Sequence, residues 1–327
     1  RSNSAEEAVS TWAEEELGGA IFGGGTVFPG IPTSTYRDCL FEANVAAQDG
    51  SAIFGAAKLI RCKILGNVNT TVGGTLRYAW LDRCTVVGNT PTGVGGVVLR
   101  DGYLESSILW ANAGASIAGS TWGNHNCIEG GALGTGNIDV DPQFTDLAQG
   151  DLTLAVGSPC IDTGNPSAPL DADLTPADLG ALAFTWLPIG TSYCSANLNS
   201  SGQTAAIAAL GSTSVADDFL RVQTTHTAVD QLGLFMMSQN QGFVPFFNGS
   251  QGNLCVSAPI VRLTNTPGSV SSSGPQGLLN LRVGLTTLPA GLSILPGQTW
   301  HFQSWFRDNV GGNSTSNTSD AVSVTFQ

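Results

Sequence analysis

The chain has 327 residues, of which 42% are hydrophobic and 11% charged, so it is too apolar for a disordered chain and long enough for two domains. Its net charge of −13, with Lys58 and Lys63 as the only lysines, disfavours non-specific binding to nucleic acid or to an anionic membrane. No run of 18 uninterrupted apolar residues is present, so we expect a protein that is not membrane-embedded.

Residues 4–17 predict a short helix near the start of the chain. Ser4 and Glu7 have the spacing of a capping box, and Val9 and Trp12 lie on one apolar stripe. A helix over residues 1–22 would cover the open end of a β-helix, if the segment that follows is one. The alternative is a disordered acidic start.

A repeat of 22 to 23 residues follows, in four units at 36–44, 59–67, 81–89 and 104–112. Each unit has a small residue at its fourth position and an asparagine at its ninth. These positions are Cys39, Cys62, Cys84 and Ser107, and then Asn44, Asn67, Asn89 and Asn112. Short alternating strands at this period predict a parallel β-helix, in which equivalent residues stack about 4.8 Å apart. The glycines and β-branched residues between the units argue against a helical solenoid.

The asparagines of this ladder have two expected roles. Asparagine tolerates positive φ at a tight bend, and stacked amides can hydrogen-bond from coil to coil. The residues just before it are small (Ala43, Gly66, Gly88 and Ala111), which suits a crowded corner. The stacked cysteines have parallel Cβ vectors, so we expect free, buried thiols rather than disulfides.

After Asn126 the repeat loosens, and residues 136–184 form a distinct closing segment. It contains Asp141-Pro142-Gln143-Phe144, Gly150-Asp151, Gly157-Ser158-Pro159-Cys160-Ile161-Asp162-Thr163-Gly164, Asp171-Ala172-Asp173 and Asp178-Leu179-Gly180-Ala181. With the coils, this run resembles bacterial secreted right-handed parallel β-helix proteins of the pectate-lyase-like superfamily over residues 23–185. The resemblance implies a fold and an exported location but no single activity, because lyases, hydrolases and non-catalytic surface proteins share it. Whether Cys127 and Cys160 pair in this segment stays open.

Residues 185–191 predict a linker with Pro188 and Gly190, and residues 192–327 a second all-β domain. Alternating runs separated by Gly/Pro/Ser/Asn-rich turns favour an antiparallel β-sandwich. This part resembles an uncharacterised C-terminal module of large secreted bacterial proteins. Cys194 and Cys255 are the best disulfide candidates of the chain.

Charged residues fall in two outward columns of the coils. One contains Asp38, Arg61 and Arg83, and the other Arg37, Asp82 and Glu105, with Lys63 nearby. Their signs alternate, and no group of three carboxylates converges with a lone base, so we interpret them as surface ion pairs. The closing-motif residues Asp139 and Asp141 are expected to serve turns.

Three further groups are candidate sites. Asp171, Asp173 and Asp178 could bind calcium through hard oxygen ligands or could cap Asx-type turns. In the second domain, Trp305 is expected to face outward near His301 and Arg307, where it would stack on a sugar or lie under a loop. The third group is Phe243, Phe246 and Phe247, which surround Pro245 and are expected to form a partner contact or a packed loop. The three histidines (125, 226 and 301) do not have the spacing of metal ligands.

These observations favour a non-catalytic extracellular or cell-surface protein, in which a β-helix scaffold carries a C-terminal module for attachment, assembly or glycan contact. Expected partners are a second copy, a surface protein or a polysaccharide, with no cofactor apart from the candidate calcium. The alternative is a polysaccharide lyase or glycoside hydrolase of the β-helix type. No signal peptide precedes Arg1, so the chain is expected to be a mature or trimmed product.

Overall fold

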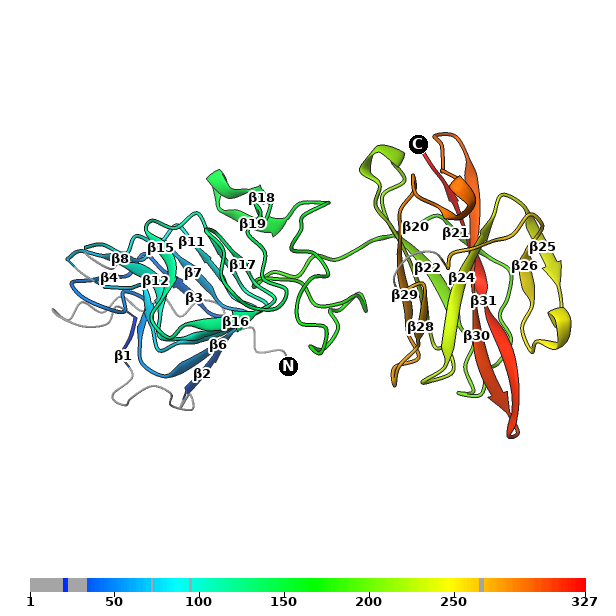
Figure 1. The fold of residues 1–327 in the computed structure, drawn as a ribbon, viewed down its shortest axis with the longest axis horizontal. Helices are drawn as coiled ribbons and strands as arrows, with labels where there is room; N and C mark the ends of the chain where they lie inside the picture. Colours follow the sequence, from blue (N-terminus) through cyan, green and yellow to red (C-terminus); the bar gives the residue numbers. More distant parts are fainter. Residues whose placement is uncertain (1–19, 23–33, 72, 94–95, 265–267) are drawn as a thin grey trace, which may run out of the picture. The chain divides into compact units, whose positions relative to one another are not determined.

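The computed structural model describes residues 20–22, 34–71, 73–93, 96–264 and 268–327, and it divides the chain into two units, Arg1–Thr185 and Trp186–Gln327. In the described ranges both units consist of β-strands, with four short 3-10 helices in total (Figure 1). The helix predicted over residues 4–17 lies outside the described residues.

The first unit is a parallel β-solenoid of about 4 turns, which confirms the predicted β-helix. Within the described residues its coils build three five-stranded parallel sheets. Sheet A contains β1 (Ile21–Phe22), β5 (Ile53–Phe54), β9 (Leu76–Arg77), β12 (Val97–Arg100) and β15 (Ala115–Ala118). Sheet B contains β2 (Ser34–Arg37), β6 (Ala57–Ile60), β10 (Trp80–Asp82), β13 (Tyr103–Glu105) and β16 (Trp122–Asn124). Sheet C contains β3 (Leu40–Glu42), β7 (Lys63–Leu65), β11 (Thr85–Val87), β14 (Ile108–Trp110) and β17 (Cys127–Ile128), and β4 (Val45–Ala46) pairs with β8 (Val68–Asn69).

Apolar side chains stack in register inside the solenoid. Leu81 of sheet B pairs with Leu59 in the coil before it and with Leu104 in the coil after it, and all three are buried. In sheet C, Val86 lies in the same way between Ile64 and Leu109. Because one face of each strand points inward, every coil covers the apolar surface of its neighbour, as the sequence columns predicted.

The bends after sheet C differ from the prediction in their backbone. Positive φ falls on Ala43, Gly66, Gly88 and Ala111, with values of 53°, 59°, 69° and 52°, and not on the asparagines that follow. A Cβ added to Gly66 would meet nothing within 4 Å, so crowding is not what favours glycine there. Glycine is favoured there because the backbone is left-handed. This conformation turns the backbone amide of the next residue toward the neighbouring coil.

The asparagines hydrogen-bond from coil to coil, as predicted. Asn67 donates from its backbone N and from its side-chain Nδ2 to Oδ1 of Asn89, both over 2.9 Å. Asn44 donates in the same way to Asn67, and Asn89 to Asn112. Asn67 and Asn89 are fully buried, so the ladder satisfies polar groups that water cannot reach.

A second ladder runs along the bend between sheets B and C, and the sequence did not predict it. The backbone N of Cys84 donates to Ser107 Oγ over 3.0 Å, and that of Ser107 donates to Asn126 Oδ1 over 2.8 Å. Asn126 then donates to Asn137 Oδ1. Asn126 therefore continues the cysteine column, whereas the asparagine ladder does end there, because the next coil contributes Glu129, which accepts from the backbone N of Ala111 over 2.7 Å. Cys39, Cys62 and Cys84 are free thiols, as expected, and Cys62 and Cys84 are buried, whereas Cys39 is only half-buried.

The closing segment packs on the outer face of sheet C. Thr85, Ile108 and Cys127 point outward from this sheet and are nevertheless buried. The backbone N of Ala181 donates to Thr85 Oγ1 over 2.9 Å. The segment also contains the hairpin of β18 (Phe144–Asp146), η1 (Leu147–Gln149) and β19 (Asp151–Leu154).

Cys160 brings its thiol from the closing segment against that of Cys127. Both cysteines are buried and unpaired in the structure. The hydrogen bond with Cys127, together with burial, raises the pKa of the Cys160 thiol well above its usual range. The two thiols therefore pack as neutral groups between the segment and sheet C.

The second unit has two antiparallel sheets. The four-stranded sheet orders β20 (Pro188–Ile189), β22 (Ala206–Gly211), β23 (Leu220–Thr225) and β29 (Leu279–Val283). The six-stranded sheet orders β21 (Thr191–Tyr193), β31 (Asn313–Thr325), β30 (Thr299–Val310), β24 (Leu232–Ser238) and β27 (Val261–Arg262), with β28 (Val270–Ser272) also on β24. A separate hairpin joins β25 (Gln241–Val244) to β26 (Leu254–Val256), and short helices are η2 (Val215–Asp217), η3 (Phe247–Gly249) and η4 (Pro289–Gly291).

One apolar core fills the space between these sheets, as a β-sandwich requires. Trp300, Phe302 and Phe306 of β30 belong to it, so these side chains point inward, away from the face on which Trp305 was predicted. The predicted linker 185–191 is wrong in its extent, because β20 and β21 are strands of the two sheets. Pro188 is accommodated because β20 is an edge strand, where a missing N–H costs no ladder bond.

The structure joins Cys194 to Cys255 by the expected disulfide, with their Cα atoms 6.2 Å apart. The bridge connects the segment after β21 to β26 and closes a loop with a sequence separation of 61 residues. It therefore ties the β25–β26 hairpin to the start of the second unit.

Replacing Asn89 by alanine is expected to destabilise the first unit by about 1–3 kcal/mol, because buried backbone groups lose their partners. The control is Asn44→Ala, since the Asn44 side chain makes a single hydrogen bond and is only half-buried. Hydrogen exchange, which resolves the two units, should show faster exchange in the coils for Asn89→Ala and a much smaller change for Asn44→Ala. Equal effects of the two substitutions would contradict the ladder.

Removing the disulfide is expected to destabilise the second unit by about 4 kcal/mol from the loss of loop-closure entropy. The double variant Cys194→Ser/Cys255→Ser should unfold at a lower urea concentration than the wild-type chain. Reductant should lower the wild-type midpoint and leave the double variant unchanged. If reductant leaves the urea midpoint of the wild-type chain unchanged, the disulfide does not contribute to stability.

Candidate functional site

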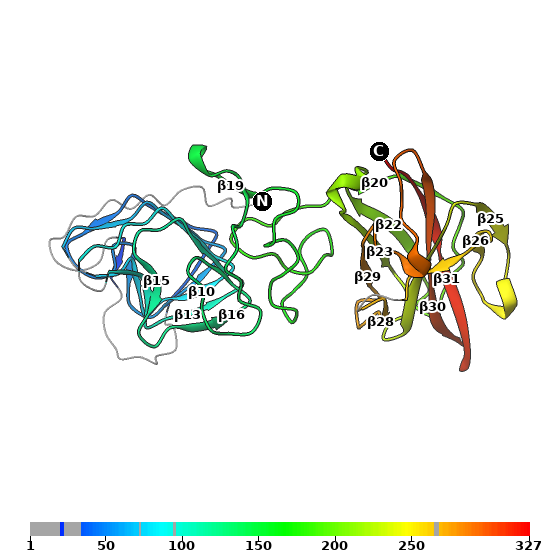
Figure 2. The same cartoon turned by 45° about the horizontal axis from the view of Figure 1, so that its top comes forward.

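Two rows of side chains face outward from sheet B. Leu59, Leu81 and Leu104 point inward, so their neighbours along each strand point to the other face. The register places Lys58, Trp80, Tyr103 and Trp122 in one row, and Ile60, Asp82, Glu105 and Asn124 in the row beside it. Figure 2 shows β10, β13 and β16, which carry most of both rows, side by side.

The first row is a run of aromatic rings. The ring centroids of Trp80 and Tyr103 are 5.6 Å apart, and those of Tyr103 and Trp122 are 4.5 Å apart. The rings meet at tilted and edge-to-face angles, which fixes their positions on the sheet. Trp122 is 58% exposed, so this row ends in an open ring face.

The second row supplies two carboxylates from adjacent coils. Asp82 lies 3.9 Å from Lys58 Nζ and 3.6 Å from Arg83 Nε. Glu105 accepts a hydrogen bond from the Tyr103 hydroxyl and lies 3.2 Å from His125 Nδ1. Burial, aided by the Glu105 carboxylate, raises the pKa of the Tyr103 hydroxyl, which therefore stays protonated as a donor.

These contacts partly confirm the predicted charge columns. Arg61 forms a two-point contact with Asp38 at 2.7 and 2.8 Å, as expected for neighbouring coils. In the other column, Ile60 lies between Arg37 and Asp82, so those two charges are not adjacent. Lys63 is in sheet C and does not line this surface.

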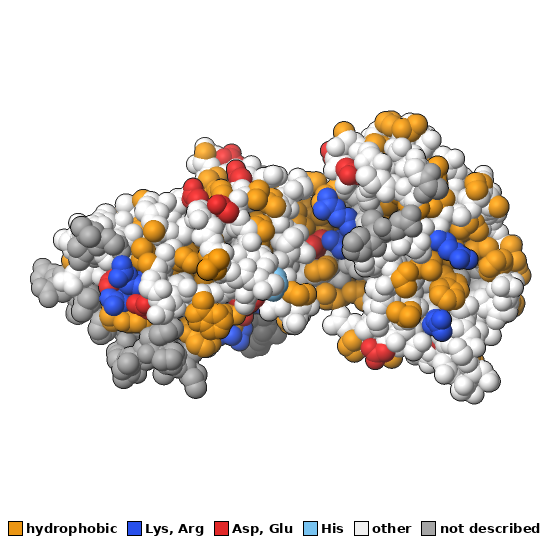
Figure 3. Space-filling model, viewed as in Figure 1, with side chains coloured by type: hydrophobic (Ala, Val, Ile, Leu, Met, Phe, Trp, Pro, Cys, Tyr) orange, Lys and Arg blue, Asp and Glu red, His pale blue; other side chains and the backbone are white. Residues whose placement is uncertain are grey.

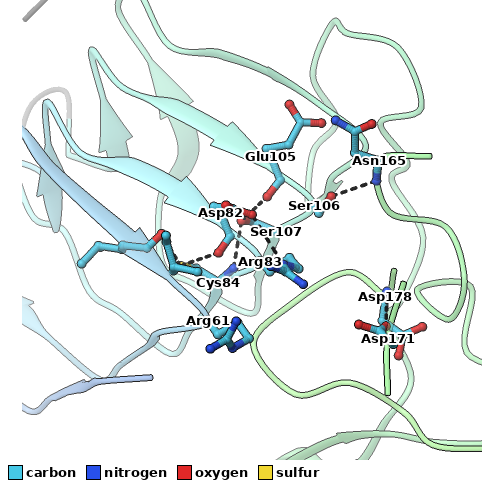
Figure 4. Close-up of polar contacts among 12 residues, drawn as sticks. Arg61, Asp82, Arg83, Cys84, Glu105, Ser106, Ser107, Asn165, Asp171 and Asp178 are labelled. Carbon is cyan, nitrogen blue, oxygen red and sulfur yellow. Dashed lines mark hydrogen bonds and ion pairs between the residues drawn. The ribbon is translucent and has the colours of Figure 1, made fainter. Parts of the chain in front are cut away.

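The closing segment forms a wall beside the two rows. The backbone N of Asn165 donates to Ser106 Oγ over 2.9 Å, which anchors the loop of residues 165–169 at the bend after β13. The loop and the rows enclose a hollow of about 300 Å³ that is lined by Trp80, Asp82, Arg83, Tyr103, Glu105 and Asn165, among others. Figure 4 shows Asp82, Arg83 and Glu105 on the coils, with Asn165 opposite them. We name this surface the sheet B groove.

Sequence reasoning missed the groove. Trp80 and Tyr103 each stand directly before a repeat unit, 23 residues apart, and Trp122 follows 19 residues later, which is a signal that the sequence contained. The wall could not be predicted, because residues 165–169 reach Ser106 from a segment without a periodic pattern.

The predicted calcium ligands cap turns of the closing segment. Asp178 accepts hydrogen bonds from the backbone N of Asp162 and of Phe184, over 2.6 and 2.5 Å. Asp171 accepts from the backbone N of Asp178, and Asp173 from that of Thr175. Within the described ranges, no three His, Cys, Asp or Glu side chains are arranged to hold a metal ion. Calcium binding here stays a prediction, and turn capping is what these carboxylates do in the structure.

The second predicted ligand group is only partly brought together. Trp305 is half-buried and lines a hollow, as expected for an outward position. His301 is buried against Tyr193 at 5.5 Å, with Nδ1 2.7 Å from Ser323 Oγ, so it faces no ligand. Arg307 is exposed but outside this hollow, where Arg262 of β27 takes the place that the sequence assigned to Arg307.

No family model matches the chain, and neither the curated proteins nor the solved structures gave a match. In the part of the chain that the structure describes, no helix has the length and apolarity needed to cross a membrane.

Asp178 predicts a pH dependence of the first unit. Burial raises the pKa of its carboxyl to about 7 from the ordinary 3.8. Between these pH values the unfolded chain has lost the proton that the folded chain keeps, so folding takes up a proton and stability falls as pH rises from about 4 to about 7. The urea midpoint of the first unit should fall over this range.

The control is Asp178→Asn, which cannot ionise. Its midpoint should vary less than that of the wild type between pH 4 and 7, because the substituted side chain takes up no proton on folding. The same slope in both proteins would mean that other groups cause the pH dependence.

Proposed function

We propose that the protein is a non-catalytic extracellular or cell-surface scaffold that holds a carbohydrate chain in the sheet B groove. The observation that carries this proposal is the aromatic row of Trp80, Tyr103 and Trp122 beside the carboxylates of Asp82 and Glu105. The β-helix keeps both rows in fixed register over successive coils.

The chemistry of the two rows suits a sugar. A pyranose has an apolar face of C–H groups, which packs on an aromatic ring, and hydroxyls around its edge. Carboxylates are strong acceptors for those hydroxyls, because charged groups form the stronger hydrogen bonds. Lys58, Arg83 and the Asn165 loop add donors on both sides of the hollow. Adjacent coils would place consecutive sugars over consecutive rings.

Two further features support an exported location. The Cys194–Cys255 disulfide suits an oxidising compartment. The closing segment carries the motifs by which the sequence resembles secreted β-helix proteins, and it packs on the outer face of sheet C.

Hydrolysis of the glycan is the alternative function, because Asp82 and Glu105 are two acids from adjacent coils, as glycoside hydrolysis uses. Both side chains are already engaged. Glu105 is held by Tyr103 and His125, and Asp82 lies against two cations. A general acid or nucleophile must instead be free to approach the glycosidic bond. These contacts favour binding without cleavage.

Trp80→Ala and Trp122→Ala should each weaken binding of a neutral polysaccharide about five-fold, since one stacking contact contributes about 1 kcal/mol. Affinity electrophoresis against a panel of neutral and acidic polysaccharides, followed by calorimetry with the best oligosaccharide, measures this change. Trp110→Ala is the matched control, because Trp110 lies on sheet C of the same solenoid and is half-buried, as Trp80 is.

Equal losses in all three variants, or no binding to any glycan of the panel, would contradict the proposal. Release of reducing ends or of unsaturated products would instead establish the catalytic alternative. Size-exclusion chromatography of the sample distinguishes glycan binding from self-association.

A further inference from the structure

A second hollow lies on the outer face of the six-stranded sheet, in the second unit. Its volume is about 840 Å³. Leu234 and Met236 of β24 and Trp305 of β30 form its floor, and Leu254 of β26 and Phe247 of η3 form a wall. Figure 3 shows hydrophobic side chains gathered on the side of this unit where Figure 1 places β25 and β26, with arginine side chains among them.

The wall of this hollow is fixed before any ligand arrives. The buried Gln303 side chain accepts from the backbone N of Cys255 over 2.9 Å and donates to the carbonyls of Asn253 and Ser319, each over 2.8 Å. The disulfide holds Cys255 from its other side. Trp305, two residues beyond Gln303, packs on Met236 and Leu254. A pre-formed wall lowers the entropic cost of binding.

Arg262 is the charged residue of the lining. It is exposed, and among the residues that the structure describes no acidic side chain forms an ion pair with it. Ser250 and Thr318 also line the hollow, but their hydroxyls donate to backbone carbonyls. An apolar hollow with one cation at its edge is complementary to an apolar body that carries one negative charge.

We infer that this hollow binds a small amphipathic anion, with a flat aromatic or alicyclic ring against Trp305 and a carboxylate on Arg262. Guanidinium and carboxylate match as a two-point hydrogen-bonded pair. The volume lies within the range of about 300–1,000 Å³ that is usual for small-molecule sites, and the mostly apolar lining is typical of them. In the sheet B groove, by contrast, Lys58 and Arg83 already lie against the carboxylate of Asp82, so the two surfaces select different chemistries.

The test is a calorimetric titration of the full chain with 2-naphthoate, and with 2-naphthalenemethanol as the neutral analogue. We expect one naphthoate per chain and at least ten-fold weaker binding of the alcohol. Arg262→Met should weaken naphthoate binding at least ten-fold and leave the alcohol unchanged. Arg307→Met is the matched control and should change neither, because Arg307 is an exposed arginine of the same sheet outside the hollow.

The far-ultraviolet spectrum of each variant checks its fold, and both arginines are exposed, so neither substitution opens the core. Absence of saturable naphthoate binding would overturn the inference. So would equal affinity for the two ligands, equal losses in Arg262→Met and Arg307→Met, or several equivalent sites per chain, since these outcomes describe non-specific adsorption to apolar surface.

Discussion

Hydrogen bonding between equivalent residues of successive coils is the constraint on which the first unit depends. The amides of Asn44, Asn67 and Asn89 each donate to the next coil, and a parallel chain of contacts runs through Ser107 and Asn126 at the other bend. These contacts fix the register of every strand. A slip by one residue would turn the inward leucines of sheet B outward and break the aromatic and acidic rows together.

The sheet B groove and the hollow at Trp305 both lie on the outer face of a β-sheet, but they form in different ways. In the solenoid, identical positions stack, so a site is a row that repeats along the axis, and the closing segment adds the irregular wall. In the sandwich, the outer face of β30 is covered at Gln303 by the β25–β26 hairpin and left open at Trp305. The main sheets supply the floor and the recognition groups in both cases, while a segment outside these sheets supplies the wall.

Structural features that recur periodically in the sequence could be predicted, whereas features that depend on contacts between distant segments could not. Stacked leucines and asparagines recur at a constant spacing, so the coils and their register could be predicted. The backbone of Ala43 and Ala111 could not, because alanine does not signal positive φ. Likewise, Pro188 suggested a linker but lies on an edge strand, and Arg262 reaches the hollow of Trp305 through a strand pairing that no local pattern reveals.

The asparagine ladder also has a direction. The contacts between the amides of successive asparagines run toward the following coil, so within the described residues Oδ1 of Asn44 accepts from no other asparagine. At the opposite end, Glu129 instead of an asparagine accepts, from the backbone N of Ala111. A duplicated coil inserted ahead of Asn44 would find a matching acceptor and a matching apolar surface. Such a molecule can lengthen by gene duplication at one end, one coil at a time, while the groove stays intact at the other.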